Sequence, residues 1–106
     1  MIDEHILQQV VDRIVAAAKP SRVILFGSYG RDNADKGSDL DIMVVKPEVT
    51  DKAVEIVRLH EVVGDVGTGV DVLVYSDEEF DRRSRVPGTV LYWARREGRP
   101  LYEAAH

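Results

Sequence analysis

Residues 22–45 read RVILFGSYGRDNADKGSDLDIMVV and contain two apolar runs separated by a polar, glycine-rich segment. The first run, residues 22–26, is β-branched and aromatic and is too short for a helix. The second run, residues 40–45, has the same character. The glycines and charges of residues 27–38 indicate a loop with room for one helical turn. We therefore predict two buried strands joined by a long loop.

The sequence on either side of these strands predicts helices and a third strand. Apolar residues at helical spacing predict a helix whose start Asp3 can cap and which ends before Pro20. A second helix, of about three turns, is expected between Asp51 and Gly64. The apolar run at residues 70–75 predicts the third strand.

Two shorter helices are expected after the third strand. Ser76 and Glu79 fit a capping box, in which each side chain satisfies the other residue's free backbone N–H, so a helix should begin there. Pro87 and Gly88 interrupt it, and a last helix over residues 89–97 should stop at Gly98. The order of elements indicates a small three-stranded α/β or α+β sandwich, with residues 1–106 forming one domain.

Composition excludes several classes of protein. The chain of 106 residues has no cysteine, which excludes a disulfide scaffold and a cysteine zinc site. Its net charge of -5 disfavours non-specific binding to nucleic acid or to a membrane surface. The sequence has no apolar run long enough for a membrane span, and its acidic start is unlike a signal peptide. We therefore expect a cytoplasmic protein.

The charge is unevenly distributed along the chain. Residues 82–106 carry six arginines and only two glutamates, whereas the rest of the chain is strongly acidic. This segment, with its aromatic residues Tyr92, Trp93 and Tyr102, is a candidate docking surface for an acidic partner. The alternative interpretation is that the arginines solvate two short helices and that Trp93 packs in the core.

Three aspartates stand at or inside the predicted strands. Asp39 and Asp41 are two residues apart, so their side chains are expected on the same face of the sheet, where like charges repel unless a cation lies between them. Asp71 lies inside the third strand, where desolvating a lone carboxylate among branched aliphatic residues is expensive. If the strands are near neighbours, the three carboxylates converge. Hard oxygen ligands of this kind suit Mg²⁺ or Mn²⁺.

Gly27 and Ser28 follow directly on the first strand. They can present backbone N–H groups and a hydroxyl to an anion without a Cβ blocking its approach, and a phosphate is the natural guest. Each feature also has a plain structural interpretation: a turn after a strand, Asp39 as a cap, and Asp71 satisfied by a backbone donor. Their joint occurrence favours a site for phosphate and metal.

The joint pattern resembles the minimal nucleotidyltransferase (MNT) family of the DNA polymerase β superfamily. In that family Gly-Ser and Asp-x-Asp are separated by ten residues, and a later strand carries another carboxylate. Five residues match it position by position: Gly27, Ser28, Asp39, Asp41 and Asp71. The longer loop form Gly-Ser-Tyr-small-Arg-Gly is met by residues 27–31, but Asp32 stands where glycine is common. That departure concerns the conformation of the loop rather than the metal site.

The resemblance implies a mixed sheet of three to four strands backed by helices, as in the palm of polymerase β. It also implies Mg²⁺-dependent transfer of a nucleoside monophosphate from a triphosphate, with two ions at Asp39, Asp41 and Asp71 and with Mn²⁺ as the other candidate metal. Asp71 would also assist as general base. Four residues would bind the nucleotide, with the first three on its phosphates: Gly27, Ser28, Arg31 and Ser38.

The resemblance also suggests the acceptor. Stand-alone MNT proteins of this length resemble the antitoxin halves of toxin–antitoxin pairs, whose partner is an all-helical HEPN ribonuclease. We therefore expect transfer of AMP from ATP to a hydroxyl of such a partner, in particular a tyrosine, without direct contact to nucleic acid or membrane. Two alternatives stay open. One is a non-catalytic nucleotide-binding subunit that neutralises a HEPN partner by contact, and the other is a small-molecule nucleotidyltransferase.

Overall fold

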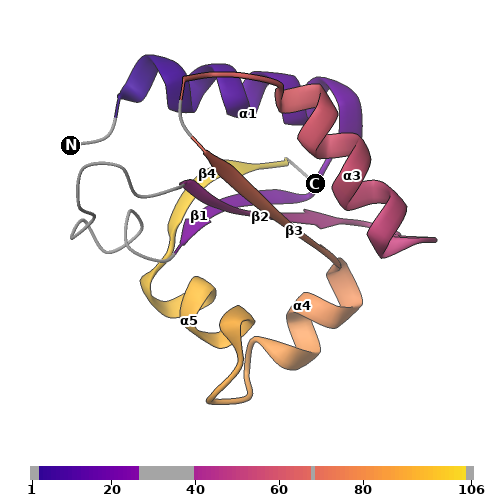
Figure 1. Ribbon diagram of the computed structural model, residues 1–106. Coiled ribbons are helices and arrows are strands. Elements are labelled where there is room, and N and C mark those ends of the chain that lie inside the picture. Colours follow the sequence, from indigo (N-terminus) through magenta and orange to yellow (C-terminus); the bar gives the residue numbers. More distant parts are fainter. Residues whose placement is uncertain (1–2, 27–39, 68, 105–106) are drawn as a thin grey trace.

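The computed structural model describes residues 3–26, 40–67 and 69–104. Helices α1 and α3 cover one face of a central sheet, and α4 and α5 cover the other (Figure 1). In chain order the described elements are α1 (Glu4–Ala18), β1 (Arg22–Phe26), β2 (Leu40–Lys46), α3 (Lys52–Val63), β3 (Val70–Ser76), α4 (Asp77–Arg83), α5 (Val90–Glu97) and β4 (Arg99–Glu103). The predicted α/β (α+β) fold class is confirmed.

The sheet has four strands in the order β3-β2-β1-β4. Strand β1 is antiparallel to both of its neighbours, whereas β2 and β3 run parallel. Helix α3 supplies the crossover that a parallel pair needs. The sheet is therefore mixed, and the starts of β2 and β3 lie at the same end as the last residue of β1.

Strand β4 is absent from the chain-order prediction above. Its second residue, Pro100, lies opposite Ile24, and the register shifts so that Tyr102 lies opposite Val23. Leu101 is thus an extra residue that forms a bulge. A proline weakens a strand prediction, but an edge strand with a bulge tolerates one because its outer side needs no ladder hydrogen bonds.

Side-chain caps fix the helix ends as the sequence predicts. The carboxylate of Asp3 accepts from the first backbone N–H groups of α1, and the capping box of Ser76 and Glu79 opens α4. Helix α1 ends where Lys19 adopts a left-handed conformation, with φ of 47°, directly before Pro20. Local chemistry alone therefore determines where these elements start and stop.

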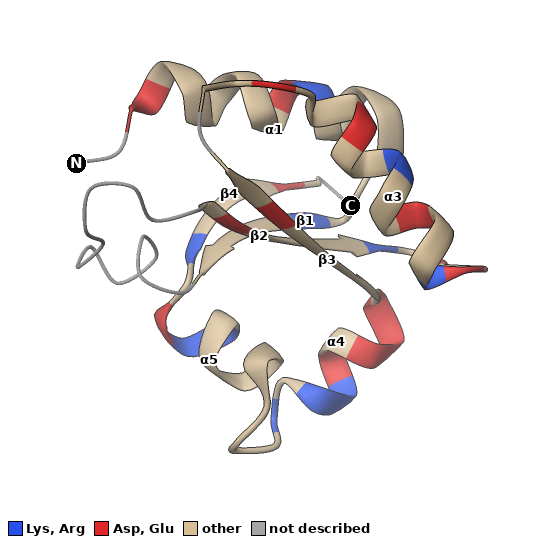
Figure 2. Ribbon diagram, in the orientation of Figure 1, with Lys and Arg blue, Asp and Glu red and all other residues tan. Residues whose placement is uncertain are grey.

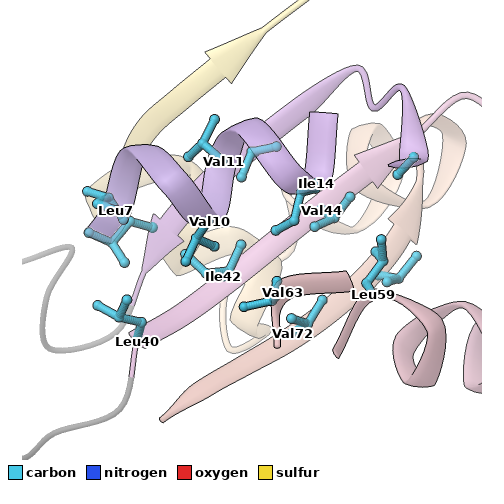
Figure 3. Close-up of a cluster of buried hydrophobic side chains, with 14 residues drawn as sticks. Leu7, Val10, Val11, Ile14, Leu40, Ile42, Val44, Leu59, Val63 and Val72 are labelled. Carbon is cyan, nitrogen blue, oxygen red and sulfur yellow. The ribbon is translucent and has the colours of Figure 1, made fainter. Parts of the chain in front are cut away.

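The larger core lies between the sheet and helices α1 and α3 (Figure 3). Ile14 of α1 and Ile42 and Val44 of β2 are completely buried in it. A smaller core lies on the other face, where Met43 and Val45 meet residues of α4 and α5. Alternate residues of β2 thus belong to different cores, as the two-residue period of a strand requires.

Helix α3 forms where the sequence predicts a helix, but its apolar residues are not all buried. Leu59 and Val63 are buried, but Val54 and Val57 are 61% and 59% exposed. The helix contacts α1 and β3 with only one narrow side, so Val54 and Val57 point to solvent although their spacing is typical of a buried helical face. Among the described residues, no helix is long and apolar enough to cross a membrane.

Candidate functional site

The site begins with three residues in a row across neighbouring strands. Phe26, the last residue of β1, lies opposite Asp41 near the start of β2, and Asp41 lies opposite Asp71 on β3. Neighbouring strands are about 4.8 Å apart, so the two carboxylates come from adjacent backbone positions. The condition stated above for convergence is therefore met for two of the three carboxylates, because the strands that carry Asp41 and Asp71 are neighbours.

Both aspartates belong to the face of the sheet that α4 and α5 cover. Asp41 precedes Met43 by two residues and Asp71 precedes Tyr75 by four, and both of these apolar residues contribute to the smaller core. Phe26 packs against the same core. The row of Phe26, Asp41 and Asp71 therefore faces the side on which α5 lies.

The predicted burial of Asp71 is wrong. Asp71 is exposed, whereas Asp41 is half-buried. Because β3 is an edge strand and α4 begins only at its far end, the start of β3 stays open to water. A cation is favoured here even though Asp71 is not desolvated, because two carboxylates in register on adjacent strands still repel each other.

Several predicted site residues lie outside the described part of the chain. They are Gly27, Ser28, Arg31, Ser38 and Asp39. The described residues that flank this stretch, Phe26 and Leu40, both lie at the end of the sheet where Asp71 is found. Their roles remain predictions.

Asp41 and Asp71 have the chemistry of a Mg²⁺ site. Each offers hard carboxylate oxygens, and Mg²⁺ is commonly held by one or two carboxylates together with substrate phosphates. No group of three or more metal-binding side chains occurs within the described residues, where Asp39 is not included. Two carboxylates on adjacent strands thus fit the cation, and the proposed third ligand belongs to residues 27–39.

A pocket of about 460 Å³ lies beside Phe26, at one end of this row. Phe26 and α5 form its walls, and Trp93 is 49% exposed there. The pocket is lined by Phe26, Gly88, Thr89, Val90, Trp93, Ala94, Glu97 and Gly98. The sequence drew attention to Trp93 only as a core or docking residue. Trp93 lies near Phe26 because α5 packs against β1, and no local sequence pattern predicts that long-range contact.

Acidic residues balance much of the positive charge of residues 82–106. Within α4 and the turn after it, Arg82, Arg83 and Arg85 each pair with an acidic residue four positions earlier, at N–O distances of 3.4, 3.8 and 3.0 Å. Arg99 pairs with Glu4 of α1 at 2.8 Å. Figure 2 shows acidic residues at the start of α4 and basic ones towards its end. The local excess of arginine is therefore a weaker argument for an acidic partner than the sequence suggests.

Comparison with known proteins agrees with the fold. A family model described as "Nucleotidyltransferase domain" matches residues 7–92. A putative nucleotidyltransferase from Sulfolobus solfataricus is similar in structure, with a TM-score of 0.61 and 24% identity over 92% of this chain and 86% of that one. No curated protein matches the sequence.

Two further solved structures share the fold. One is a toxin–antitoxin with AMP-PNP, with a TM-score of 0.61 and 20% identity over 92% of this chain and 73% of that one. The other is a mutant of the toxin–antitoxin MntA-HpeT in which two aspartates are replaced by glutamate, with a TM-score of 0.57 and 19% identity over 98% of this chain and 75% of that one. At these identities the similarity establishes the mixed α+β fold.

Proposed function

This chain belongs to the nucleotidyltransferase domain family, and on that premise we propose that it transfers AMP from ATP to a protein hydroxyl, in particular a tyrosine. The acceptor would be a helical HEPN-type toxin, and the protein would act as the antitoxin of the pair. The observation that carries the proposal is the register of Asp41 and Asp71 on adjacent parallel strands, on the face of the sheet where Phe26 and α5 form the pocket described above (the α5 pocket).

Asp39, Asp41 and Asp71 are the residues that would hold the divalent cation. Bound Mg²⁺, or Mn²⁺, would neutralise phosphate charge and lower the pKa of the attacking hydroxyl, with two ions present once the nucleotide is bound. The described pair fits this role because both side chains offer oxygen ligands on one face of the sheet.

The protein groups orient the reactants and move one proton. The acceptor oxygen attacks the α-phosphorus of ATP, the bond from that phosphorus to the bridging oxygen breaks, and pyrophosphate leaves. Asp71, which is exposed at the sheet edge, would take the hydroxyl proton as general base. Gly27, Ser28 and Ser38 would hold the nucleotide, and Arg31 would offset the charge that develops on pyrophosphate.

Two observations support a protein acceptor in a toxin–antitoxin pair. Structures of toxin–antitoxins share this fold, and one of them was solved with AMP-PNP. The acidic net charge of -5 also disfavours a nucleic-acid acceptor. The proposal therefore places the acceptor hydroxyl on another chain.

The test uses the protein together with a helical protein encoded beside it, with ATP and Mg²⁺, and measures intact mass. We expect the partner to gain one or more AMP units with the wild-type protein and none with Asp71→Asn. Glu48→Gln is the matched control, because Glu48 is an exposed carboxylate just beyond the opposite end of β2. It should leave the transfer unchanged. A stable complex without added mass, equally strong for wild type and Asp71→Asn, would establish the non-catalytic binding subunit instead.

A further inference from the structure

We infer that the α5 pocket is the subsite for the nucleobase and that Trp93 stacks on the base, with a preference for purines over pyrimidines. This inference rests on the proposed function, since it assigns a binding mode to the same nucleotide. It concerns residues that the Gly-Ser and Asp-x-Asp patterns do not include.

The position of the pocket relative to the carboxylates is the first argument. Phe26 lines the pocket and lies opposite Asp41 in the sheet. The pocket and both aspartates therefore share one face, and Phe26 at the pocket wall lies two strands from Asp71, at a backbone separation of about 10 Å. A nucleotide whose α-phosphate lies at the aspartates must extend its ribose and base to one side, and α5 provides a wall there.

The chemistry of the pocket selects the base rather than the phosphates. Its volume of about 460 Å³ is within the usual range for small-molecule sites. Phe26, Val90, Trp93 and Ala94 give it apolar and aromatic walls. The uncharged, flat end of a nucleotide is the part that such a pocket accommodates.

Trp93 contacts a neighbouring aromatic ring and keeps about half of its surface in contact with water. Its ring meets that of Tyr92 edge to face, with centroids 5.3 Å apart and an angle of 83° between the planes. Trp93 is nevertheless 49% exposed, and Val90 beside it is 36% exposed. An exposed indole positioned by a neighbouring ring can stack on a flat ligand at little entropic cost.

The hydroxyl of Thr89 is already used within the chain. Its oxygen lies 3.0 Å from the carbonyl oxygens of Arg83 and Val86 and accepts from the N–H of Tyr92 at 3.1 Å. Recognition therefore depends mainly on stacking, which favours the larger ring system of a purine.

The experiment uses the fluorescence of Trp93, which is the only tryptophan in the chain. The full protein is titrated with the Mg²⁺ forms of ATP, CTP and inorganic tripolyphosphate, and calorimetry measures the binding of each in parallel. We expect strong quenching by ATP, weaker quenching by CTP, and little change with tripolyphosphate even where calorimetry records binding.

Variants of Trp93 separate stacking from phosphate binding. Trp93→Ala should weaken ATP binding roughly 5- to 150-fold, the usual range for loss of one base–aromatic stack, and leave tripolyphosphate affinity unchanged. Trp93→Phe should restore most of the affinity. Val57→Ala is the control, because Val57 is an exposed apolar residue of α3, which covers the other face of the sheet. If Trp93→Ala fails to fold, Val90→Gln should give the same selective loss.

Three results would overturn the inference. The first is ATP affinity that Trp93→Ala leaves unchanged, and the second is equal quenching by ATP and tripolyphosphate. The third is a Trp93 signal that responds to the protein partner alone, which would make the pocket a protein-docking surface. If wild-type protein binds neither ATP nor tripolyphosphate with Mg²⁺, the proposed function itself fails. Nucleotide binding without any role for Trp93 refutes only the base subsite.

Discussion

The two faces of the sheet differ in how completely helices cover them. Helices α1 and α3 close one face over a continuous aliphatic core. On the other face α4 and α5 bury a smaller cluster, Phe26 lines a pocket, and Asp41 and Asp71 follow Phe26 across the neighbouring strands. Consecutive residues of β2 serve both faces, since Ile42 is fully buried on the first while Asp41 belongs to the second. Stability and chemistry are thus divided between opposite sides of the same strands.

Helix length explains the difference. Helices α1 and α3 have 15 and 12 residues, whereas α4 and α5 have seven and eight. At about 1.5 Å per residue, an eight-residue helix covers roughly half of a seven-residue strand. Among the described elements, the short helices therefore leave part of this face uncovered, and the exposed Asp71 lies in that part.

The largest expected effect is on the face that α1 and α3 cover (the closed face), as opposed to the face of α4 and α5 (the open face). Ile42→Ala removes a completely buried side chain from the larger core and should lower the free energy of unfolding by about 2–5 kcal/mol. Trp93→Ala, which truncates a half-exposed residue of the open face, should cost less than about 1 kcal/mol. Chemical denaturation measures both. Equal losses would mean that the open face contributes as much to stability as the closed one.

A second prediction concerns the close contact that holds α5 on the open face. A Cβ at Gly98 would lie 2.3 Å from the carbonyl oxygen of Ala94 and 2.6 Å from Cγ2 of Ile24. Gly98→Ala should therefore displace α5 and lower the free energy of unfolding by about 1–3 kcal/mol. Thermal and chemical unfolding provide the measurement. Adding Ile24→Ala should not restore stability, because the backbone contact with Ala94 persists, and full recovery would contradict this account.

A third prediction concerns how stability depends on pH, through an ion pair of α3 on the face that α1 and α3 cover. The hydrogen bond from Arg58 to Glu55 lowers the pKa of that carboxyl to about 2 from an ordinary value of 4.5, with a further contribution from Lys46. The stabilisation is complete above about pH 4.5 and is lost as the pH falls towards 2. The full shift corresponds to about 3 kcal/mol, and solvent screening at the exposed Arg58 reduces the expected loss to about 1–2 kcal/mol.

Denaturation at several pH values checks this ion pair. Glu55→Gln should flatten the dependence of stability on pH between 4.5 and 2. Glu78→Gln is the control, since Glu78 is 86% exposed and its pair with Arg82 has an N–O distance of 3.4 Å. An unchanged pH profile in Glu55→Gln would show that the network contributes nothing to folding.

The smallest expected stability effect belongs to the site. Asp71→Asn removes one of two carboxylates in register, at an exposed position, so the free energy of unfolding should rise slightly or change by less than about 0.5 kcal/mol. The same variant is expected to abolish AMP transfer. Chemical denaturation measures the stability of this variant, and the intact mass of the partner measures AMP transfer. A large loss of stability would make Asp71 a structural residue instead.

Much of the architecture was predictable because its signals are local. The caps at Asp3, Asp51 and Ser76 are short-range hydrogen bonds that the sequence displays directly. Strand β4 escaped prediction because Pro100 masks it and its pairing with β1 is long-range. The same reason applies to α3, where apolar spacing alone did not distinguish buried Leu59 from exposed Val57.

The sequence by itself determined the boundaries of most elements, the family and the candidate carboxylates, because these depend on residue types at fixed spacing. Only the tertiary structure decided that Asp41 and Asp71 are register partners, that Asp71 is exposed, and that a pocket with Trp93 lies beside Phe26. Strand order and helix packing bring together residues that are far apart in the chain. The whole core stabilises that strand order and packing, so no single segment of the sequence reveals them.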